Sequence, residues 1–448
     1  MSNMKLCELF DGITSELEFP HHLATDSRDV EKGGAFVALE GEKTDGHKYI
    51  PQAVQNGAGL LIVRKGKAPE GLSVPVLELD NPERDLAAAA SRKLKAHNLH
   101  DIIAITGSVG KTTTRAALQK VLAPHFVLHA PERSFNTLIG CTATIMAMPL
   151  ETEIVILEFG ANKPGEIKEL TEYFPPTIAI LTAVAPVHLE GFGSVEGVLR
   201  EKLEIVHSSS ISKIIYNHDN EYLAESFKYV VKSMGVGEWR DSDFVLAVDR
   251  SEYTLPALSF VLAHRESQEI ARFTANIWGK HNAMPLALAA STGHELGIPL
   301  QESADALADF QALEGRGRVI ILDNGHKFLV DDAYNANPAS MRASLETFTK
   351  VVCAGKIAVL GEMRELGENA AKFHAELEPL LDEIDCAILV GDVWREAFPQ
   401  NEEYVFVNDW KEALQTVRDF TAQREVQGVL VKGSHSIGLE NVVRELCS

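Results

Sequence analysis

The stretch from Ile102 to Thr114, which reads IIAITGSVGKTTT, constrains the fold more than any other part of this sequence. Four apolar residues at its start predict a short buried strand, and the run from Thr113 to Leu122 predicts a helix. Gly107 and Gly110 between them allow a tight turn whose backbone N–H groups can bind phosphate at the helix N-terminus. The usual phosphate-loop pattern has a further glycine where this chain has Ile105. The residues predicted to bind the nucleotide here are Gly107, Ser108, Val109, Gly110, Lys111, Thr112 and Thr113.

Length, composition and charge restrict the class of protein. A chain of 448 residues is expected to form two to four domains, and 45% hydrophobic residues allow a large core. The formal net charge of −22 argues against a general nucleic-acid binder, which needs a basic face. No apolar run approaches the roughly 18 to 20 residues of a membrane span, and the first residues contain no signal-peptide core. The five cysteines are scattered without a C-x-x-C pair. These features predict a cytoplasmic protein without membrane insertion.

The order of apolar runs predicts an α/β protein of three domains. Residues 1–98 form a small α/β unit, residues 99–310 a doubly wound sheet around the phosphate loop, and residues 311–448 a Rossmann-like domain. The strands predicted for the second domain are 102–105, 153–157, 177–181 and 213–216. Those predicted for the third are 327–330, 357–360, 387–390 and 429–431.

Two polar residues follow strands of the predicted central sheet. Glu158 ends the run from Ile154, and His188 follows the run from Ile180. Ligands of such sheets gather at the carboxyl ends of the strands, so both side chains are predicted to lie beside the phosphate loop. A carboxylate there, with the hydroxyl of Thr112, suits Mg²⁺.

A series of motifs resembles the Mur ligase family of ATP-dependent amide ligases, which make peptidoglycan precursors. The series runs from about residue 25 to residue 440 and includes Thr25–Asp29, Asp45–His47, Thr106–Thr112, Ala185–Gly193, Trp278–Asn282, Gly315–Arg318 and Asp331–Pro338. The loop Asp331–Pro338, supported by Leu360–Gly367 and His374, is similar to the branch that adds D-alanyl-D-alanine. The resemblance implies ATP and Mg²⁺ as cofactors, and UDP-MurNAc-tripeptide and D-alanyl-D-alanine as substrates.

The resemblance also implies roles for single residues. By composition Lys202 is a surface lysine, but in this family the corresponding lysine is carbamylated by CO₂ and helps to hold Mg²⁺ with Thr112, Glu158 and His188. Arg316 is expected on ATP phosphate, with Arg318 as the alternative. His281 and Asn282 are expected on the adenine and ribose side, although they could simply cap a helix, and Asp332 is expected on the ribose.

The substrate contacts come from three regions. Ser27, Arg28, Thr44 and Asp45, in or beside the loop 41–47, are expected to bind the UDP part. The remaining contacts implied by the resemblance are Asn136, Tyr334, Asn335, Asn337 and Lys432. The chain departs from the family pattern at Thr137 and at Pro285, where asparagines are usual.

The predicted function is ATP-dependent ligation of D-alanyl-D-alanine to the carboxylate of UDP-MurNAc-tripeptide through an acyl phosphate. Lys111, His188, Lys202 and Arg316 are the predicted catalytic residues, and the chain is expected to be a monomer. The residue that takes the proton from the amine stays open, with His188 as a candidate by position. The alternatives are another amide ligase of the same superfamily, or a regulatory phosphate-loop NTPase. A GTPase is disfavoured because Tyr216–Asn220 lacks the lysine of the guanine motif.

Overall fold

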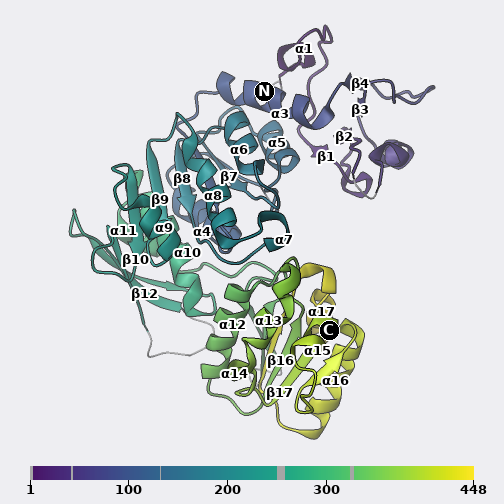
Figure 1. The fold of residues 1–448 in the computed structure, drawn as a ribbon. Helices are drawn as coiled ribbons and strands as arrows, with labels where there is room; N and C mark the ends of the chain where they lie inside the picture. The colour runs from purple at the N-terminus through teal and green to yellow at the C-terminus, as the bar shows by residue number, and fades with distance from the viewer. Residues whose placement is uncertain (1–3, 42–43, 132, 250–257, 323–326) are drawn as a thin grey trace.

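The computed structural model describes residues 4–41, 44–131, 133–249, 258–322 and 327–448. Three sheets follow one another along the chain, each covered by helices, and Figure 1 shows them as three successive bodies from the N-terminus to the C-terminus. The predicted three-domain α/β architecture is therefore confirmed. No helix in the described ranges has both the length and the apolar character that crossing a membrane requires.

The first sheet is parallel and has the order β1-β2-β3-β4. Its elements are α1 (Leu6–Leu9), β1 (Leu23–Ala24), β2 (Ala35–Val37), α2 (Ile50–Gln55), β3 (Leu60–Arg64), β4 (Val76–Leu79) and α3 (Pro82–Ala96). The long helix α3 begins with Asn81 as its N-cap and Pro82 in its first turn, as helix-start signals predict. It packs against α5 of the next unit, so the first two apolar cores are continuous.

The central sheet has nine strands in the order β13-β12-β11-β10-β9-β8-β5-β7-β6. Its strands are β5 (Asp101–Thr106), β6 (Leu128–His129), β7 (Ile154–Phe159), β8 (Ile178–Leu181), β9 (Lys213–Asn217), β10 (Ser233–Gly237), β11 (Phe244–Val248), β12 (Leu258–His264) and β13 (Ile270–Ala275). Its helices are α4 (Lys111–Leu122), α5 (Leu138–Ala147), α6 (Glu166–Tyr173), α7 (Leu189–Phe192), α8 (Val195–Leu203), α9 (Glu221–Phe227), α10 (Ala283–Glu295) and α11 (Leu300–Leu307).

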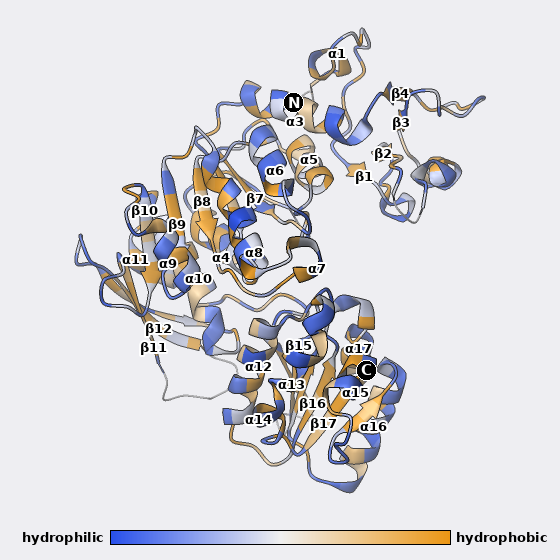
Figure 2. Cartoon of the chain, in the orientation of Figure 1, coloured by the Kyte–Doolittle hydropathy of each residue, from blue (hydrophilic) through white to orange (hydrophobic). Residues whose placement is uncertain are grey.

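Side chains of β5 alternate between two cores, one on each face of this sheet. Ile103 and Ile105 pack with Leu118 of α4, whereas Ala104 belongs to the core on the other face. Figure 2 shows the strands as apolar and the covering helices as mixed, as expected for a sheet buried on both faces. The antiparallel edge formed by β12 and β13 is not part of the predicted doubly wound sheet.

The third sheet has the order β14-β15-β19-β16-β17-β18, parallel except for the edge strand β14. Its strands are β14 (Arg318–Leu322), β15 (Lys327–Asp332), β16 (Lys356–Gly361), β17 (Cys386–Val390), β18 (Val405–Val407) and β19 (Gly428–Lys432). Its helices are α12 (Pro338–Lys350), α13 (Ala370–Ala375), α14 (Glu378–Leu381), α15 (Asp392–Ala397), α16 (Trp410–Gln423) and α17 (Glu440–Cys447). Trp278, which precedes α10, packs into the apolar core of this third unit.

Candidate active site

The phosphate loop joins β5 to α4 and depends on its two glycines. Gly107 has a φ of +147°, and a Cβ there would lie 2.0 Å from Oγ1 of Thr182. Gly110 has a φ of +85° and is the residue before the first turn of α4. A side chain at either position would be strained, so glycine is required at both. Ile105, at the position of the missing glycine, is a fully buried strand residue and takes no part in the turn.

The side chains around the loop fix its shape. Oγ of Ser108 donates to the carbonyl of Ala185 at 3.2 Å and accepts from its N–H at 3.0 Å, and the Thr182 hydroxyl donates to the carbonyl of Val109 at 2.5 Å. Nζ of Lys111 donates to the carbonyl of Gly107 at 2.6 Å. Burial, with a smaller opposing effect of Glu158, lowers the pKa of Lys111 to about 8. The loop is thus held from the sheet side with a cationic amine inside its curve.

The predicted magnesium ligands Thr112 and Glu158 are in direct contact. The Thr112 hydroxyl donates to Oε2 of Glu158 at 3.1 Å, and Oγ of Ser134 lies 3.0 Å from the same hydroxyl. Oε1 of the fully buried Glu158 accepts from Nε of Arg115 at 2.6 Å. A buried carboxylate beside a hydroxyl is an oxygen pair of the kind that Mg²⁺ prefers, so these residues fit the ion. Arg115 was not among the predicted site residues, although its position one turn after Thr112 on α4 was a usable signal.

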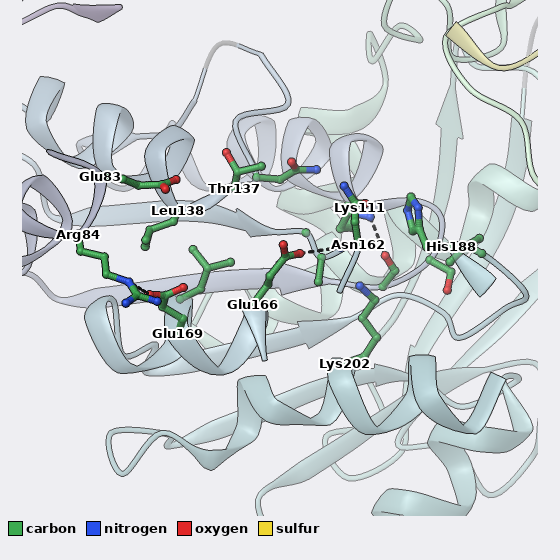
Figure 3. Close-up of a pocket in the computed structure, with 17 residues that line it drawn as sticks. Glu83, Arg84, Lys111, Thr137, Leu138, Asn162, Glu166, Glu169, His188 and Lys202 are labelled. Atoms are coloured by element: carbon green, nitrogen blue, oxygen red, sulfur yellow. Dashed lines mark hydrogen bonds and ion pairs between the residues drawn. The ribbon is translucent and has the colours of Figure 1, made fainter. Parts of the chain in front are cut away.

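Lys202 and His188 line one cavity with Lys111. The cavity has a volume of about 300 Å³, and residues of the phosphate loop, of the segment 160–169 and of α8 surround it. Figure 3 shows Lys202 rising from α8 toward the end of the cavity where Lys111 and His188 lie. Only 2% of Lys202 is exposed, so the surface location expected from composition is wrong. Burial, and then the charge of Lys111, lowers the pKa of Lys202 to about 7.

His188 connects this cavity to the third domain. Its backbone is left-handed, with a φ of 50°, and its Nδ1 forms a hydrogen bond with the carboxylate of Glu365. Burial lowers the pKa of His188, and the carboxylate of Glu365 partly offsets that effect. Glu365 lies within the segment Leu360–Gly367 noted in the sequence, but nothing in the sequence pairs it with His188.

The loop before α5 supplies Asn136 to the same cavity. A Cβ on Gly160 would lie 2.7 Å from Cγ of Asn136, so the amide lies flat over that glycine. Oγ1 of Thr137 accepts from the N–H of Gly140 at 3.4 Å and caps α5. Threonine is a common N-cap residue, which accounts for its presence at this position.

His281 and Asn282 lie at the start of α10, beside the phosphate loop. Asn282 donates to the carbonyl of Trp278 at 2.7 Å and makes no side-chain cap, so the simple capping interpretation is wrong. Nδ1 of His281 is buried and finds no hydrogen-bond partner within the described part of the chain. Burial lowers the pKa of His281 to about 4. Pro285 packs on the loop, since its Cγ would lie 3.4 Å from a Cβ on Gly110.

Arg316 of the third domain already contacts the central domain. Its Nη2 lies 3.4 Å from Oγ of Ser134, and its guanidinium stacks on the ring of Tyr334 at 4.0 Å. Both residues line a second cavity of about 810 Å³ together with Thr112. Arg318, the alternative to Arg316, lies in the same cavity with its Nε 4.0 Å from Asp331.

Three predicted contact residues in or beside the loop after β15 make contacts that shape this region. Oδ2 of Asp332 lies 2.8 Å from Nζ of Lys432 and accepts from Ser344 at 2.6 Å. Lys432 is 2% exposed and donates to the carbonyl of Asn335 at 3.0 Å, so it supports the loop. Asn337 is the N-cap of α12, where its Oδ1 accepts from Ser340 at 2.9 Å. Tyr334 and Asn335 are exposed.

The predicted UDP contacts lie on the first domain, away from both cavities. Arg28 is an exposed side chain paired with Asp26, and this pair lowers the pKa of Asp26 to about 2. Ser27 is buried, Oγ1 of Thr44 lies 3.3 Å from the hydroxyl of Tyr49, and Asp45 binds His47. Residues 42 and 43 of this loop lie outside the described residues. None of the four described contacts lines either cavity.

Comparison with known proteins matches all three parts of the chain. Residues 20–106 match the Mur ligase family catalytic domain, residues 105–293 the Mur ligase middle domain, and residues 315–435 the Mur ligase glutamate ligase domain. A UDP-N-acetylmuramoyl-tripeptide–D-alanyl-D-alanine ligase of Mycobacterium tuberculosis (strain CDC 1551 / Oshkosh) is 31% identical, over 97% of this chain and 92% of that protein.

Two solved structures share the fold over nearly the whole chain. The MurF of Acinetobacter baumannii aligns with a TM-score of 0.83 and 26% identity, over 95% of this chain and 93% of that one. The MurF ligase of Thermotoga maritima, solved in complex with ADP, aligns with a TM-score of 0.80 and 25% identity, over 94% and 96%. With this coverage and the match of all three domains, the chain belongs to the Mur ligase family.

Proposed function

We propose that this chain joins D-alanyl-D-alanine to the carboxylate end of UDP-MurNAc-tripeptide with the conversion of ATP to ADP and phosphate. The observation that carries the proposal is the convergence of Lys111, His188 and Lys202 on one cavity, with the Thr112–Glu158 pair beside the same loop. A nucleotide-binding module without chemistry needs the loop but has no use for a buried lysine and a histidine in the same cavity. Each of the relatives named above carries the name of this ligase or of MurF.

The first step is phosphoryl transfer from ATP to the substrate carboxylate, which gives an acyl phosphate and ADP. The loop N–H groups and Lys111 hold the phosphates, and Arg316 approaches from the third domain to offset charge on the transferring group. Thr112 and Glu158 would hold a magnesium ion, which supplies electrostatic stabilisation of the phosphate oxygens when bound.

The second step is attack of the amine of D-alanyl-D-alanine on the acyl carbon, after which phosphate leaves from a tetrahedral intermediate. The amine must lose a proton to act as a nucleophile. His188 is the candidate acceptor, because its lowered pKa keeps the imidazole neutral near pH 7 and it lines the cavity.

Lys202 is proposed to carry a carbamate. Its neutral amine adds to the carbon of CO₂ with release of one proton, which converts a cationic side chain into an anionic oxygen ligand. The lowered pKa supplies the neutral amine that this addition needs.

The proposed domains are residues 1–98, 99–310 and 311–448. The first boundary follows the end of α3, and the second lies shortly before Gly315. The location proposed is the cytoplasm, where these nucleotide-linked substrates would be found, and the proposed oligomeric state is a monomer.

A coupled assay of ADP release tests the function. ADP release should require both UDP-MurNAc-tripeptide and D-alanyl-D-alanine, and single amino acids should not replace the dipeptide. Release with a different acid and amine would favour another amide ligase of the superfamily. Nucleotide hydrolysis that ignores every acid and amine would favour a regulatory NTPase.

A further inference from the structure

Two histidines and two glutamates lie together at the far end of α10 from the nucleotide site. His264 ends β12, whereas His294 and Glu295 are the last residues of α10, and Glu269 precedes β13. Since α10 has 13 residues, this group lies about 20 Å along the helix axis from His281 and Asn282. The group is therefore separate from the proposed active site.

The ligand atoms are spaced as a shared metal ion requires. One atom from each of His264, His294 and Glu295 lies within 4.8 Å of the other two. Nδ1 of His294 is 3.6 Å from Oε1 of Glu295, which is longer than a hydrogen bond. Two ligand atoms about 2.1 Å from a tetrahedral zinc ion are about 3.4 Å apart, close to the observed separation.

The Nδ1 atom of His294 lacks the hydrogen bond that a buried ring nitrogen ordinarily has. Its Nδ1 is buried and has no hydrogen-bond partner within the described residues. The stacking of His264 on Phe244, with ring centroids 4.5 Å apart, explains why the rings are buried but leaves this nitrogen unsatisfied. An unsatisfied buried nitrogen costs free energy, and a bound cation would remove that cost.

The surroundings already orient the ring nitrogens. Nε2 of His294 lies 3.3 Å from Oε2 of Glu269, whose Oε1 accepts from the N–H of Leu300 at 2.6 Å. A carboxylate on the outer nitrogen is the usual support of a metal-bound histidine, and it directs the Nδ1 lone pair inward. Nδ1 of His264 lies 2.9 Å from Oγ and 3.4 Å from the backbone nitrogen of Ser267, so a metal ion on this ring would bind through Nε2, with the Nδ1 proton donated to the Ser267 hydroxyl.

The charge of the group also suits a cation. Lys213 pairs with Oε2 of Glu295, so Oε1 is the oxygen that faces His294. The carboxylates of Glu269 and Glu295 exceed the single ammonium of Lys213 by one negative charge.

We propose that His264, His294 and Glu295 form a zinc site that fixes the turn between β12 and β13 to the end of α10. Two imidazoles and one carboxylate favour Zn²⁺ over Mg²⁺ or Ca²⁺, which prefer all-oxygen ligand sets. A water molecule would complete a tetrahedral set. The site lies outside both cavities, so we expect it to stabilise the fold and not to take part in the ligase reaction.

Titration of the metal-free full-length chain with Co²⁺, a spectroscopic substitute for Zn²⁺, tests the site. One equivalent should bind with the visible absorption of a tetrahedral complex, and one equivalent of Zn²⁺ should displace it and raise the melting temperature. His264→Gln and His294→Gln should abolish that absorption, and Glu269→Gln should weaken binding about 10- to 100-fold. ADP release by the three variants should equal that of the unchanged chain.

Two further variants serve as controls for this titration. Glu266→Gln changes an exposed neighbour of the site, and Glu40→Gln changes an exposed acidic group in the first domain that could bind metal separately. Both should leave the absorption unchanged. Absorption that survives His264→Gln and His294→Gln in folded variants, or the absence of binding at micromolar Co²⁺ and Zn²⁺, would overturn the proposal. Should either histidine variant fail to fold, Glu269→Gln and the displacement experiment on the unchanged chain still decide it.

Discussion

Two lysines that line one cavity, Lys202 buried and Lys111 half-buried, are the main residue-level feature of this protein. Lys111 and Lys202 both have pKa values lowered chiefly by burial, and the charge of Lys111 contributes to the shift of Lys202. Binding of an anionic phosphate near Lys111 would favour its protonated form, whereas a carbamate on Lys202 would replace the second positive charge by a negative one. The proposed chemistry thus requires Lys111 to be protonated and Lys202 to be carbamylated in the same cavity.

Lys111→Ala should lower the rate of ADP release by at least about 100-fold, because phosphoryl transfer depends on charge stabilisation. The fold should be intact, since the Lys111 amine contacts only the carbonyl of Gly107 among the described residues. Circular dichroism and the coupled assay measure the two effects. Lys120 lies on the same helix as Lys111, and Lys120→Ala removes only its exposed ion pair with Asp309. This variant is the matched control and should change neither the fold nor the rate. An unchanged rate in Lys111→Ala would remove this loop from the mechanism.

Arg115→Met should reduce the free energy of unfolding by roughly 3–5 kcal/mol, because it leaves the buried carboxylate of Glu158 without its partner. Denaturation by urea measures the loss. Arg133→Met is the control, because the Arg133 pair with Asp29 is exposed and should contribute about 0–1 kcal/mol. A loss in Arg115→Met no larger than that of the control would mean that the Glu158 carboxylate does not need this arginine.

The carbamate on Lys202 predicts a dependence on pH and on CO₂. The pKa of Lys202 is about 7 in the folded chain and about 10.4 when unfolded, so the charged form destabilises the fold below pH 7. This destabilisation is relieved gradually between the folded pKa and the unfolded pKa, whereas the neutral amine that reacts with CO₂ becomes available in the folded chain as the pH rises through the folded pKa. A carbamate signal from ¹³C-labelled bicarbonate should therefore grow as the pH is raised from 6 to 8.

Substitutions at Lys202 distinguish this role from a structural one. Lys202→Ala should lose activity, and short carboxylates such as formate should restore part of it by occupying the vacated space. Lys202→Arg should not be rescued, since its guanidinium stays charged and fills that space. A fully active Lys202→Ala enzyme with no carbamate signal would refute the proposal.

At the scale of elements, the sequence predicted the turns and strands that neighbouring residues determine. It did not predict the side-chain pairs that join distant segments. The turn at Gly107 and Gly110 and the strands around it could be predicted, because each depends on neighbouring residues. Pairs such as Arg115 with Glu158 and His188 with Glu365 join residues 43 and 177 positions apart, and no local pattern records them.

Two of the predicted substrate contacts also make contacts that shape the fold. Asn337 and Lys432 are polar residues in a distinctive motif, and they were expected to bind substrate. The structure places Asn337 at a helix cap and Lys432 beneath the loop. A motif thus includes the residues that shape a loop as well as those that touch a ligand, and the sequence does not separate the two. The antiparallel edge of the central sheet was missed because β10 to β13 carry no distinctive motif.

Asn337→Ala should lower the free energy of unfolding by about 1 kcal/mol, because it removes the side-chain half of the reciprocal cap on α12, the hydrogen bond that Oδ1 accepts from the N–H of Ser340. Asn335→Ala, two residues earlier on the exposed part of the loop, should leave stability unchanged and instead raise the KM for D-alanyl-D-alanine. Urea denaturation and steady-state kinetics on both variants separate the two roles. Equal stability of the two variants would mean that the cap contributes little, and would favour a substrate contact for Asn337.

At the scale of the whole molecule, the third domain is joined to the central one at several points. Arg316 reaches Ser134, Glu365 binds His188, and Trp278 is inserted into the third core. Figure 1 shows α7, which follows His188, at the border between these two domains. Gly315 and Gly317, with φ values of +69° and +79°, form the connection and can act as a hinge.

Small-angle scattering should show a smaller radius of gyration once ATP analogue and UDP-MurNAc-tripeptide are both present. The reason is that phosphoryl transfer requires Arg316 and the loop to enclose the phosphates away from water. The arrangement described here, with Arg316 already on Ser134, would then be near the closed end of the motion. An identical scattering profile with and without ligands would exclude the hinge.

Backbone strain at the contact between His188 and Glu365 would favour the opening of these two domains. Both residues have left-handed backbones, with φ values of 50° and 64°, a conformation that costs residues other than glycine roughly 1–2 kcal/mol each. The hydrogen bond between the two side chains offsets part of this cost while the domains are together. Separation of the domains would break that bond and would allow both backbones to relax. Product release would then be assisted by this relaxation, and turnover would not need a new ligand to force the domains apart.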